Sequence, residues 1–341
     1  AKVRQIIEFS KLFLAFLSNY TTFAPAMETL ILKGNEQQAI PCVATIGMFD
    51  GVHKGHRFVL SHICDYAKVH QLASMVITFD QHPREVVQTG WKPQLLTTFD
   101  ERMRLLEKTG IDYCVVLPFT KEMANLTAHD FMQLMANRLG VKVLMTGYDN
   151  RFGHNRHDTF EDYVRYGKEI GMEVEQLPAV SQKLKAKSQK PEISSSLVRR
   201  LLAEGNVKEA AKCLTYPYHI TGKVVKGEHI GTTLGFPTAN LQLNDPRKLI
   251  PASGVYAVRC LVEERRRKMF VGMMNIGTRP TFGEHSQTLE VHILDYEGDL
   301  YGQEITVGFI ERLREERQFD NEEELKAQLK KDANTVHSLK L

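Results

Sequence analysis

The sequence lacks several patterns that would assign it to a common class of protein. Its 341 residues contain neither a P-loop nor a G-x-G-x-x-G segment, so any phosphate-binding turn must be built differently. The net charge is only +3, which provides no broad basic surface for DNA or RNA. There is no internal repeat, and the ordinary hydrophobic content argues against disorder. We therefore expect a globular protein with small-molecule ligands and no nucleic-acid partner.

Cysteine is scarce and scattered. The five cysteines form no C-x-x-C pair and are odd in number, which fits neither a disulfide framework nor a zinc knuckle. Most of them lie in apolar runs, where cysteine acts as a small buried hydrophobe. They predict a reducing, cytoplasmic location.

No apolar run near the N-terminus is long enough to span a bilayer. Residues 12–17 are apolar and residues 24–26 resemble a small-residue cleavage site, as in a secretory signal. The charged Glu8 and Lys11, however, break the apolar stretch just ahead of residue 12, and a long polar segment follows residue 17. We expect no membrane partner, and we interpret residues 1–26 as a leader or extension ahead of a domain that begins near Met27.

The length exceeds that of one ordinary core, so two domains are expected. In the first half, short apolar runs alternate with segments of helical period, which predicts an α/β, Rossmann-like domain with a parallel sheet and helices on both faces. Ligands of such sheets bind beyond the carboxyl ends of the strands. The expected strands are residues 42–49, 75–79, 113–117, 141–146 and 172–177.

The pattern changes to period-two strands after residue 216, which predicts an antiparallel β-barrel. A helical segment at 197–214 is expected to close the first domain, giving domains 27–214 and 215–341. The expected barrel strands, followed by a C-terminal helix, are residues 254–262, 269–276, 289–294 and 305–309, with the helix over 321–336. The polar, lysine-rich residues 181–192 predict an exposed loop, and residues 265–268 a hairpin turn.

The strongest local signal is the decapeptide GMFDGVHKGH at residues 47–56, between the first strand and a helix. Its glycines let the chain turn and let phosphate approach the helix N-terminus. His53 and His56 can then donate to phosphate oxygens as charge develops during phosphoryl or nucleotidyl transfer. A zinc site lacks further ligands at suitable spacing, although His154 and His157 form a second H-x-x-H.

The decapeptide resembles the signature of the nucleotidylyltransferase superfamily, and specifically of the prokaryotic bifunctional riboflavin kinase/FAD synthetases. Residues 79–84 (FDQHPR), 147–153 (GYDNRFG) and 193–199 (ISSSLVR) resemble three further motifs of that family, with a serine in place of the usual threonine at Ser196. Taken alone, the serine triplet at residues 194–196 is explained equally well as the N-cap of a helix. The resemblance implies an adenylyltransferase site with His53 and His56 as catalytic residues, with ATP bound by Gly47, Phe49, Asp50, Gly51, His53, Gly55, His56, Ser195, Ser196 and Arg199, and with the flavin bound by His82, Pro83, Asp149 and Phe152.

A second set of motifs lies in the expected barrel. The glycine-rich residues 222–240 end in LGFPTAN and resemble the riboflavin kinase signature of the same family. Hydroxyl and amide oxygens suit Mg²⁺. The resemblance implies Mg²⁺ held by Thr238 and Asn240, ATP held by Gly227, Gly231, Gly235, Thr238 and Asn240, and flavin contacts from Arg279 and Arg314.

Glu290 stands in an expected strand between apolar neighbours, where a carboxylate is costly unless it is paired or functional. By resemblance it is the base that takes the proton of the riboflavin 5′-hydroxyl during attack on the γ-phosphorus of ATP. An outward-facing structural carboxylate in an alternating strand is the alternative.

The resemblance covers residues 40–335 and implies that the chain phosphorylates riboflavin to FMN and adenylylates FMN to FAD with release of pyrophosphate. We expect small-molecule partners, and a weak or transient homo-oligomer stays open. Two alternatives stay open: another nucleotidylyltransferase or tRNA synthetase relative with the same turn, and a non-enzymatic flavin-binding protein. The low net charge disfavours a tRNA partner, and the intact His53, His56 and Glu290 disfavour a protein without activity.

Overall fold

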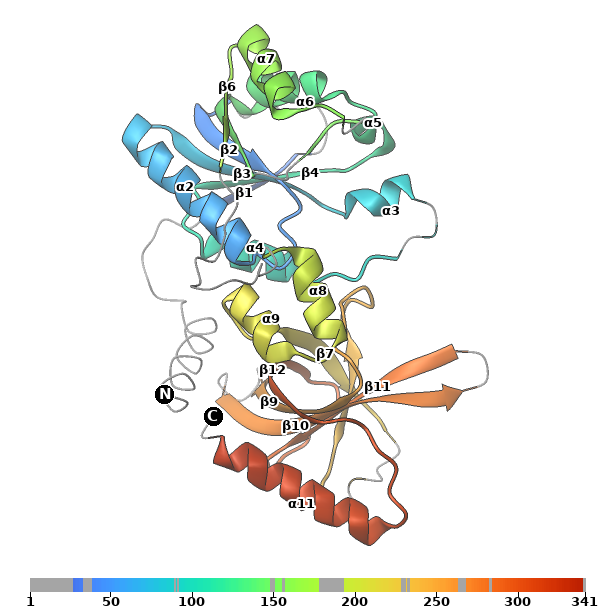
Figure 1. Ribbon diagram of the computed structural model, residues 1–341. Helices are drawn as coiled ribbons and strands as arrows, with labels where there is room; N and C mark the ends of the chain where they lie inside the picture. Colours follow the sequence, from blue (N-terminus) through green and yellow to red (C-terminus); the bar gives the residue numbers. More distant parts are fainter. Residues whose placement is uncertain are drawn as a thin grey trace, which may run out of the picture. The chain divides into compact units, whose positions relative to one another are not determined.

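The computed structural model divides the chain into two compact units, Thr22–Ser195 and Ser196–Leu341 (Figure 1). The predicted leader, the lysine-rich loop 181–192 and most of the 265–268 turn lie outside the described residues, as do the side chains of residues 278–286. None of the helices that the structure describes combines the length and the apolar character needed to cross a membrane. The described residues are 27–32, 39–88, 90, 92–147, 151–154, 157–177, 193–227, 231, 234–262, 268–281 and 284–339.

The first unit contains the parallel sheet that the sequence predicts. Six strands lie in the order β1-β4-β3-β2-β5-β6, and all neighbouring strands pair in parallel. The strands are β1 (Glu28–Ile31), β2 (Cys42–Ile46), β3 (Ala73–Phe79), β4 (Tyr113–Leu117), β5 (Val141–Thr146) and β6 (Glu173–Gln176). The helices are α2 (Lys54–His70), α3 (Pro83–Val87), α4 (Phe99–Glu107), α5 (Lys121–Ala124), α6 (Ala128–Leu134), η1 (Met135–Leu139) and α7 (Phe160–Ile170).

The strand order reverses at β2, which pairs with β3 on one side and β5 on the other. All five residues of β2 are buried, as expected for a central strand of a parallel sheet. The turn after β2 and Gly147 after β5 therefore leave the sheet side by side at its carboxyl edge. Such a switch point is where open α/β sheets bind their ligands.

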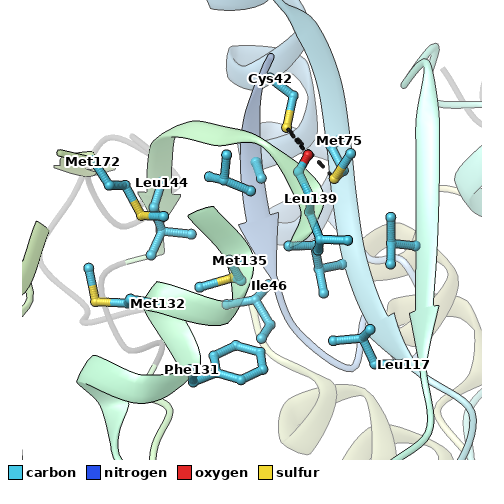
Figure 2. Packing of buried hydrophobic residues seen from close by; sticks show 14 of the residues in the cluster. Cys42, Ile46, Met75, Leu117, Phe131, Met132, Met135, Leu139, Leu144 and Met172 are labelled. Atoms are coloured by element: carbon cyan, nitrogen blue, oxygen red, sulfur yellow. Dashed lines mark hydrogen bonds between the residues drawn. The ribbon is translucent and has the colours of Figure 1, made fainter. Parts of the chain in front are cut away.

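Unbranched sulfur-containing side chains fill much of the core against β2 (Figure 2). Cys42 Sγ approaches both Met75 Sδ and Leu139 O at 3.8 Å. Met132 and Met135, from α6 and η1, belong to the same buried cluster as Ile46 at the end of β2. Flexible thioethers adapt to irregular gaps, so this packing holds the strand from which the glycine-rich turn departs.

The second unit contains the predicted antiparallel barrel, closed in the order β10-β11-β8-β7-β12-β9. Strands β7 and β8 were not among the strands expected from the sequence, and β10, β11 and β12 are longer than expected. The C-terminal helix α11 (Glu322–Ser338) confirms the expected helix. The strands are β7 (His219–Val225), β8 (Ala239–Leu243), β9 (Gly254–Val262), β10 (Lys268–Thr281), β11 (Glu284–Ile293) and β12 (Glu304–Arg314).

Residues 195–214 form two helices, α8 (Ser195–Ala203) and α9 (Val207–Leu214), where the sequence predicted one helical segment. The break falls at Gly205, whose φ of +73° and lack of a Cβ leave room for the Arg312 side chain of β12.

These two helices group with the barrel and not with the parallel sheet. Ala252 N donates to Leu202 O at 3.0 Å, and Lys208 pairs with Glu311 of β12 at 3.3 Å. The boundary between the compact units therefore lies between residues 195 and 196, whereas the sequence placed the domain boundary after residue 214.

Candidate active sites

The turn after β2 has an unusual backbone. Phe49, Gly51 and Val52 adopt φ values of +51°, +82° and +35°, in the left-handed region that β-branched and bulky residues avoid. Strain of this kind persists where the surrounding structure fixes the chain, and it concentrates at functional sites.

Asp50 is one of the groups that fix this turn. Its buried carboxylate accepts hydrogen bonds from Leu96 N (3.0 Å), Thr97 N (2.8 Å) and Thr97 Oγ1 (2.9 Å), while Gly51 N donates to the same hydroxyl at 3.0 Å. These contacts show a carboxylate that holds the turn in place, and the predicted contact of Asp50 with ATP stays a prediction. Its partner Thr97 lies 47 residues away and carried no local signal.

Arg102 supports the turn from within the protein. Its side chain is 2% exposed, and Nη2 donates to Phe79 O at 2.5 Å. Burial lowers the pKa of Arg102, and the nearby Asp50 carboxylate opposes that shift. This residue too was missed, because nothing in its local sequence marks it.

His53 and His56 lie against one another at the start of α2. Their rings stack with centroids 3.7 Å apart and an interplanar angle of 18°. His53 caps the helix, its Nδ1 accepting from His56 N at 3.4 Å, so a neutral His53 ring carries its proton on Nε2. A Cβ on Gly55 would come within 3.1 Å of the His53 ring and 3.2 Å of Ile193 O, so glycine permits this arrangement.

The environment keeps His56 neutral. Burial lowers its pKa well below the ordinary histidine value, and the positive charges of His53 and Arg57 add to the shift. His56 Nδ1 is buried without a hydrogen-bond partner among the described residues. The first turn of α2 has no acidic residue, so its free N–H groups and its positive dipole end favour an anion here.

The serine segment reaches the same turn. Ser195 Oγ donates to Asp50 O at 2.9 Å, joining positions 145 residues apart. The predicted ATP contacts of Ser196 and Arg199 stay predictions, because these residues begin the other compact unit.

His82 and Pro83 follow β3 at the same edge of the sheet. His82 caps α3: its Nδ1 accepts from Arg84 N at 3.2 Å, and its N–H donates to Glu85 Oε2 at 3.0 Å. Pro83 occupies the first turn, where a missing N–H costs nothing.

Phe152 packs within the fold. Its ring stacks on Tyr163, with centroids 4.5 Å apart at 9°, and also contacts Phe131. The predicted flavin contact from Asp149 lies outside the described residues.

The barrel places the predicted kinase residues together. In the strand register, Glu290 of β11 pairs with Asn240 of β8 on one side and with Asn275 of β10 on the other. Directly paired residues point to the same face of a sheet with Cβ atoms about 5 Å apart. Leu289 and Val291 are buried while Glu290 is half-buried, so this polar row lies on the outer face of the barrel. The sequence did not assign Asn275 to the site.

Two predicted glycines pack directly on the PTAN segment (residues 237–240). A Cβ on Gly227 would overlap the amide group of Asn240, and one on Gly231 would overlap Phe236 O and lie 3.2 Å from Thr238 Oγ1. Gly235 has a φ of +82°, a left-handed turn position that glycine adopts without cost. Gly227 and Gly231 thus lie directly against Asn240 and Thr238, which the sequence assigned to Mg²⁺ and ATP.

If the barrel carries the kinase activity that the resemblance implies, Gly227→Ala is expected to lower this activity about 10- to 100-fold, because its methyl group displaces the Asn240 amide and removes one or two polar contacts. The measurement is the initial rate of riboflavin phosphorylation in four chains: wild type, Gly227→Ala, Asn240→Ala and the double variant. If the methyl acts through Asn240, it adds little in the Asn240→Ala background. Additive losses would contradict this explanation.

Arg314 is engaged by α11. Its Nε donates to Asp332 Oδ2 at 2.8 Å, and Gln328 donates to the other oxygen of that buried carboxylate at 2.7 Å. Its Nη1 donates to Glu315 O at 3.1 Å. Arg314 therefore links β12 to the C-terminal helix α11. Its predicted flavin contact stays a prediction. The Arg279 side chain lies outside the described residues.

In the comparison with known proteins, a different family model matches each half of the chain. The FAD synthetase family model matches residues 35–196 and the riboflavin kinase model matches residues 214–340. A bifunctional riboflavin kinase/FMN adenylyltransferase of Escherichia coli K12 is 39% identical over 296 residues, covering 86% of this chain and 91% of the relative. The corresponding protein of Haemophilus influenzae is 36% identical, covering 86% and 93%.

A solved structure shares the fold. A crystal structure described as a macrolide-efflux protein from Streptococcus pneumoniae has a TM-score of 0.80 and 31% identity, covering 91% of this chain and 99% of that one. The identity and coverage of the curated relatives establish the assignment: the chain belongs to the bifunctional riboflavin kinase/FMN adenylyltransferase family.

Proposed function

We propose that the two activities of this family, which make FMN and then FAD, are divided between the two compact units. The barrel phosphorylates riboflavin, and the parallel-sheet unit transfers AMP from a second ATP to FMN. The observation that carries this proposal is the separation of two polar sites with different chemistry. One pairs two stacked histidines with a helix N-terminus, and the other places a carboxylate beside two amides.

In the adenylyltransferase site, the FMN phosphate attacks the α-phosphorus of ATP and pyrophosphate leaves. The second pKa of a phosphate monoester is about 6, so this nucleophile is already ionised near neutral pH and needs no base. His53 and His56 donate N–H groups to phosphate oxygens as negative charge develops, and the N-terminus of α2 adds its dipole. Asp50 and Ser195 hold the turn that presents them.

In the kinase site, Glu290 takes the proton of the riboflavin 5′-hydroxyl as the hydroxyl oxygen attacks the γ-phosphorus of ATP and ADP leaves. Thr238 and Asn240 supply hard oxygen ligands next to this carboxylate, which fits Mg²⁺. Bound Mg²⁺ would neutralise charge on the ATP phosphates. Gly227 and Gly231, which lie against Asn240 and Thr238, carry no side chain and so let the backbone approach those phosphates closely.

We also propose a cytoplasmic location and small-molecule partners. All five cysteines are free and buried, and burial raises the pKa of both Cys42 and Cys114 to about 12. Thiols of this kind are inert structural groups, as in proteins of a reducing compartment.

The test incubates the purified chain with riboflavin and Mg-ATP, then with FMN and Mg-ATP, and separates the flavins by chromatography. We expect FMN and FAD in the first reaction and FAD in the second. A protein that binds flavin without converting it, or that makes neither product, would refute the proposal.

A further inference from the structure

We propose that His292 is a positioning residue of the kinase reaction, which fixes the peptide between Pro237 and Thr238 beside Glu290. This inference rests on the proposed kinase function of the barrel. His292 Nδ1 lies 2.7 Å from Pro237 O. Because a carbonyl oxygen only accepts, Nδ1 carries the proton and His292 is the donor.

The position of His292 on β11 gives this bond its significance. His292 follows Glu290 by two residues, so both side chains lie on the outer face of the barrel. The same strand pairs with β8 through Val291↔Ala239 and Glu290↔Asn240. A single strand thus carries the proposed base and an anchor for the segment that supplies Thr238 and Asn240.

The segment before Thr238 is held at two points. Phe236 N donates to Gly231 O at 2.8 Å, and the Phe236 ring meets the His292 ring edge-on at 5.3 Å. Phe236 also packs against the buried cluster that contains Val336 of α11. Proline has no N–H, so the Pro237 carbonyl is the one backbone hydrogen-bonding group that this residue offers. Without His292, the hydrogen bond from Phe236 N to Gly231 O and the packing of Phe236 on the buried cluster remain, but the peptide leading into Thr238 loses its restraint.

His292→Ala should therefore raise the KM for Mg-ATP in riboflavin phosphorylation about 3- to 10-fold, the effect of one neutral hydrogen bond. The FMN adenylyltransferase rate of the same protein should not change, and it serves as an internal check on folding. An unchanged KM for Mg-ATP would overturn the proposal.

Two conservative variants separate positioning from packing. Asn places its amide nitrogen where His292 has Nδ1, whereas Gln places its nitrogen one bond further out, near Nε2. His292→Asn should restore the KM to near wild type and His292→Gln should not. Equal behaviour of the two variants would overturn the proposal.

The barrel provides a matched control. His219 Nδ1 lies 3.4 Å from Pro217 O, a similar contact at buried β7 and outside the PTAN segment. His219→Ala should lower thermal stability while leaving the KM for Mg-ATP unchanged. A rise in KM equal to that of His292→Ala would show that general barrel damage explains both.

A spectroscopic measurement is independent of activity. At about pH 8.5, well above the usual histidine pKa of about 6.5, a long-range ¹H–¹⁵N spectrum of the full chain reports which ring nitrogen carries the proton. The signal missing from His292→Asn identifies His292, and we expect the Nδ1–H tautomer. The Nε2–H tautomer would refute the inference whatever the enzyme does. Absence of kinase activity in the wild-type chain would instead refute the proposed function.

Discussion

Replacing both histidines of the turn, His53→Ala with His56→Ala, should reduce FAD formation by about three orders of magnitude while riboflavin is still converted to FMN. Loss of one preorganised donor to a developing anion typically costs 10²- to 10³-fold in rate, and two groups acting on the same phosphate chain are not additive. The stacked arrangement of the two rings makes joint replacement the cleanest test. The measurement is chromatography of the flavin products over time, from riboflavin and separately from FMN.

Two further variants control for effects on folding. The His53→Ala change itself removes the N-cap of α2, which costs about 1 kcal/mol of stability. The first control, His53→Asn, keeps a capping oxygen at this position. His62→Ala with His70→Ala makes the same chemical change at two exposed sites on α2, and it should leave both reactions intact. FAD synthesis at near wild-type rate in the His53→Ala/His56→Ala chain would contradict the role given to the turn.

Glu290→Gln should have the complementary effect. It keeps the shape of the side chain while removing the proton acceptor, and loss of a general base costs about 10²- to 10⁴-fold. Riboflavin phosphorylation should nearly stop. Conversion of supplied FMN to FAD should continue, because that reaction uses an ionised phosphate and lies in the other compact unit.

The matched control is Glu304→Gln, at the exposed first residue of β12 in the same barrel, where Asn244 donates to the carboxylate. It should leave both activities unchanged. Equal loss of both activities in Glu290→Gln would indicate unfolding or a shared site. No loss of kinase activity would return Glu290 to the role of an outward-facing structural carboxylate.

Regular, buried elements were predictable from the sequence. The expected strands at 113–117, 141–146 and 254–262 coincide with β4, β5 and β9, since each is a short segment of mostly apolar residues bounded by turn residues. Strand β1 was missed because three of its four residues are exposed and it lies at the edge of the sheet. Strand β8 was missed because it begins within the PTAN segment, whose residues were interpreted as a loop.

In both candidate sites, the residues that belong to short sequence motifs were predictable. The sequence indicated His53, His56, Gly227 and Asn240, and the structure places each pair in contact. Contacts between residues far apart in the sequence could not be predicted. The hydrogen bond from Thr97 to the Asp50 carboxylate is an example. The ion pair of Arg314 could not be predicted for the same reason. Its buried partner Asp332 lies on α11, and no local sequence pattern indicates that this helix packs against β12.

The central claim, that two independent sites carry the two reactions, has a direct test. The His53→Ala/His56→Ala chain and the Glu290→Gln chain are mixed with riboflavin and Mg-ATP, and FAD is measured by chromatography against each chain alone. The first chain should make FMN and stop, the second should make almost no product, and the mixture should make FAD, because FMN released by one is adenylylated by the other. A mixture that makes no more FAD than the separate chains would contradict the account.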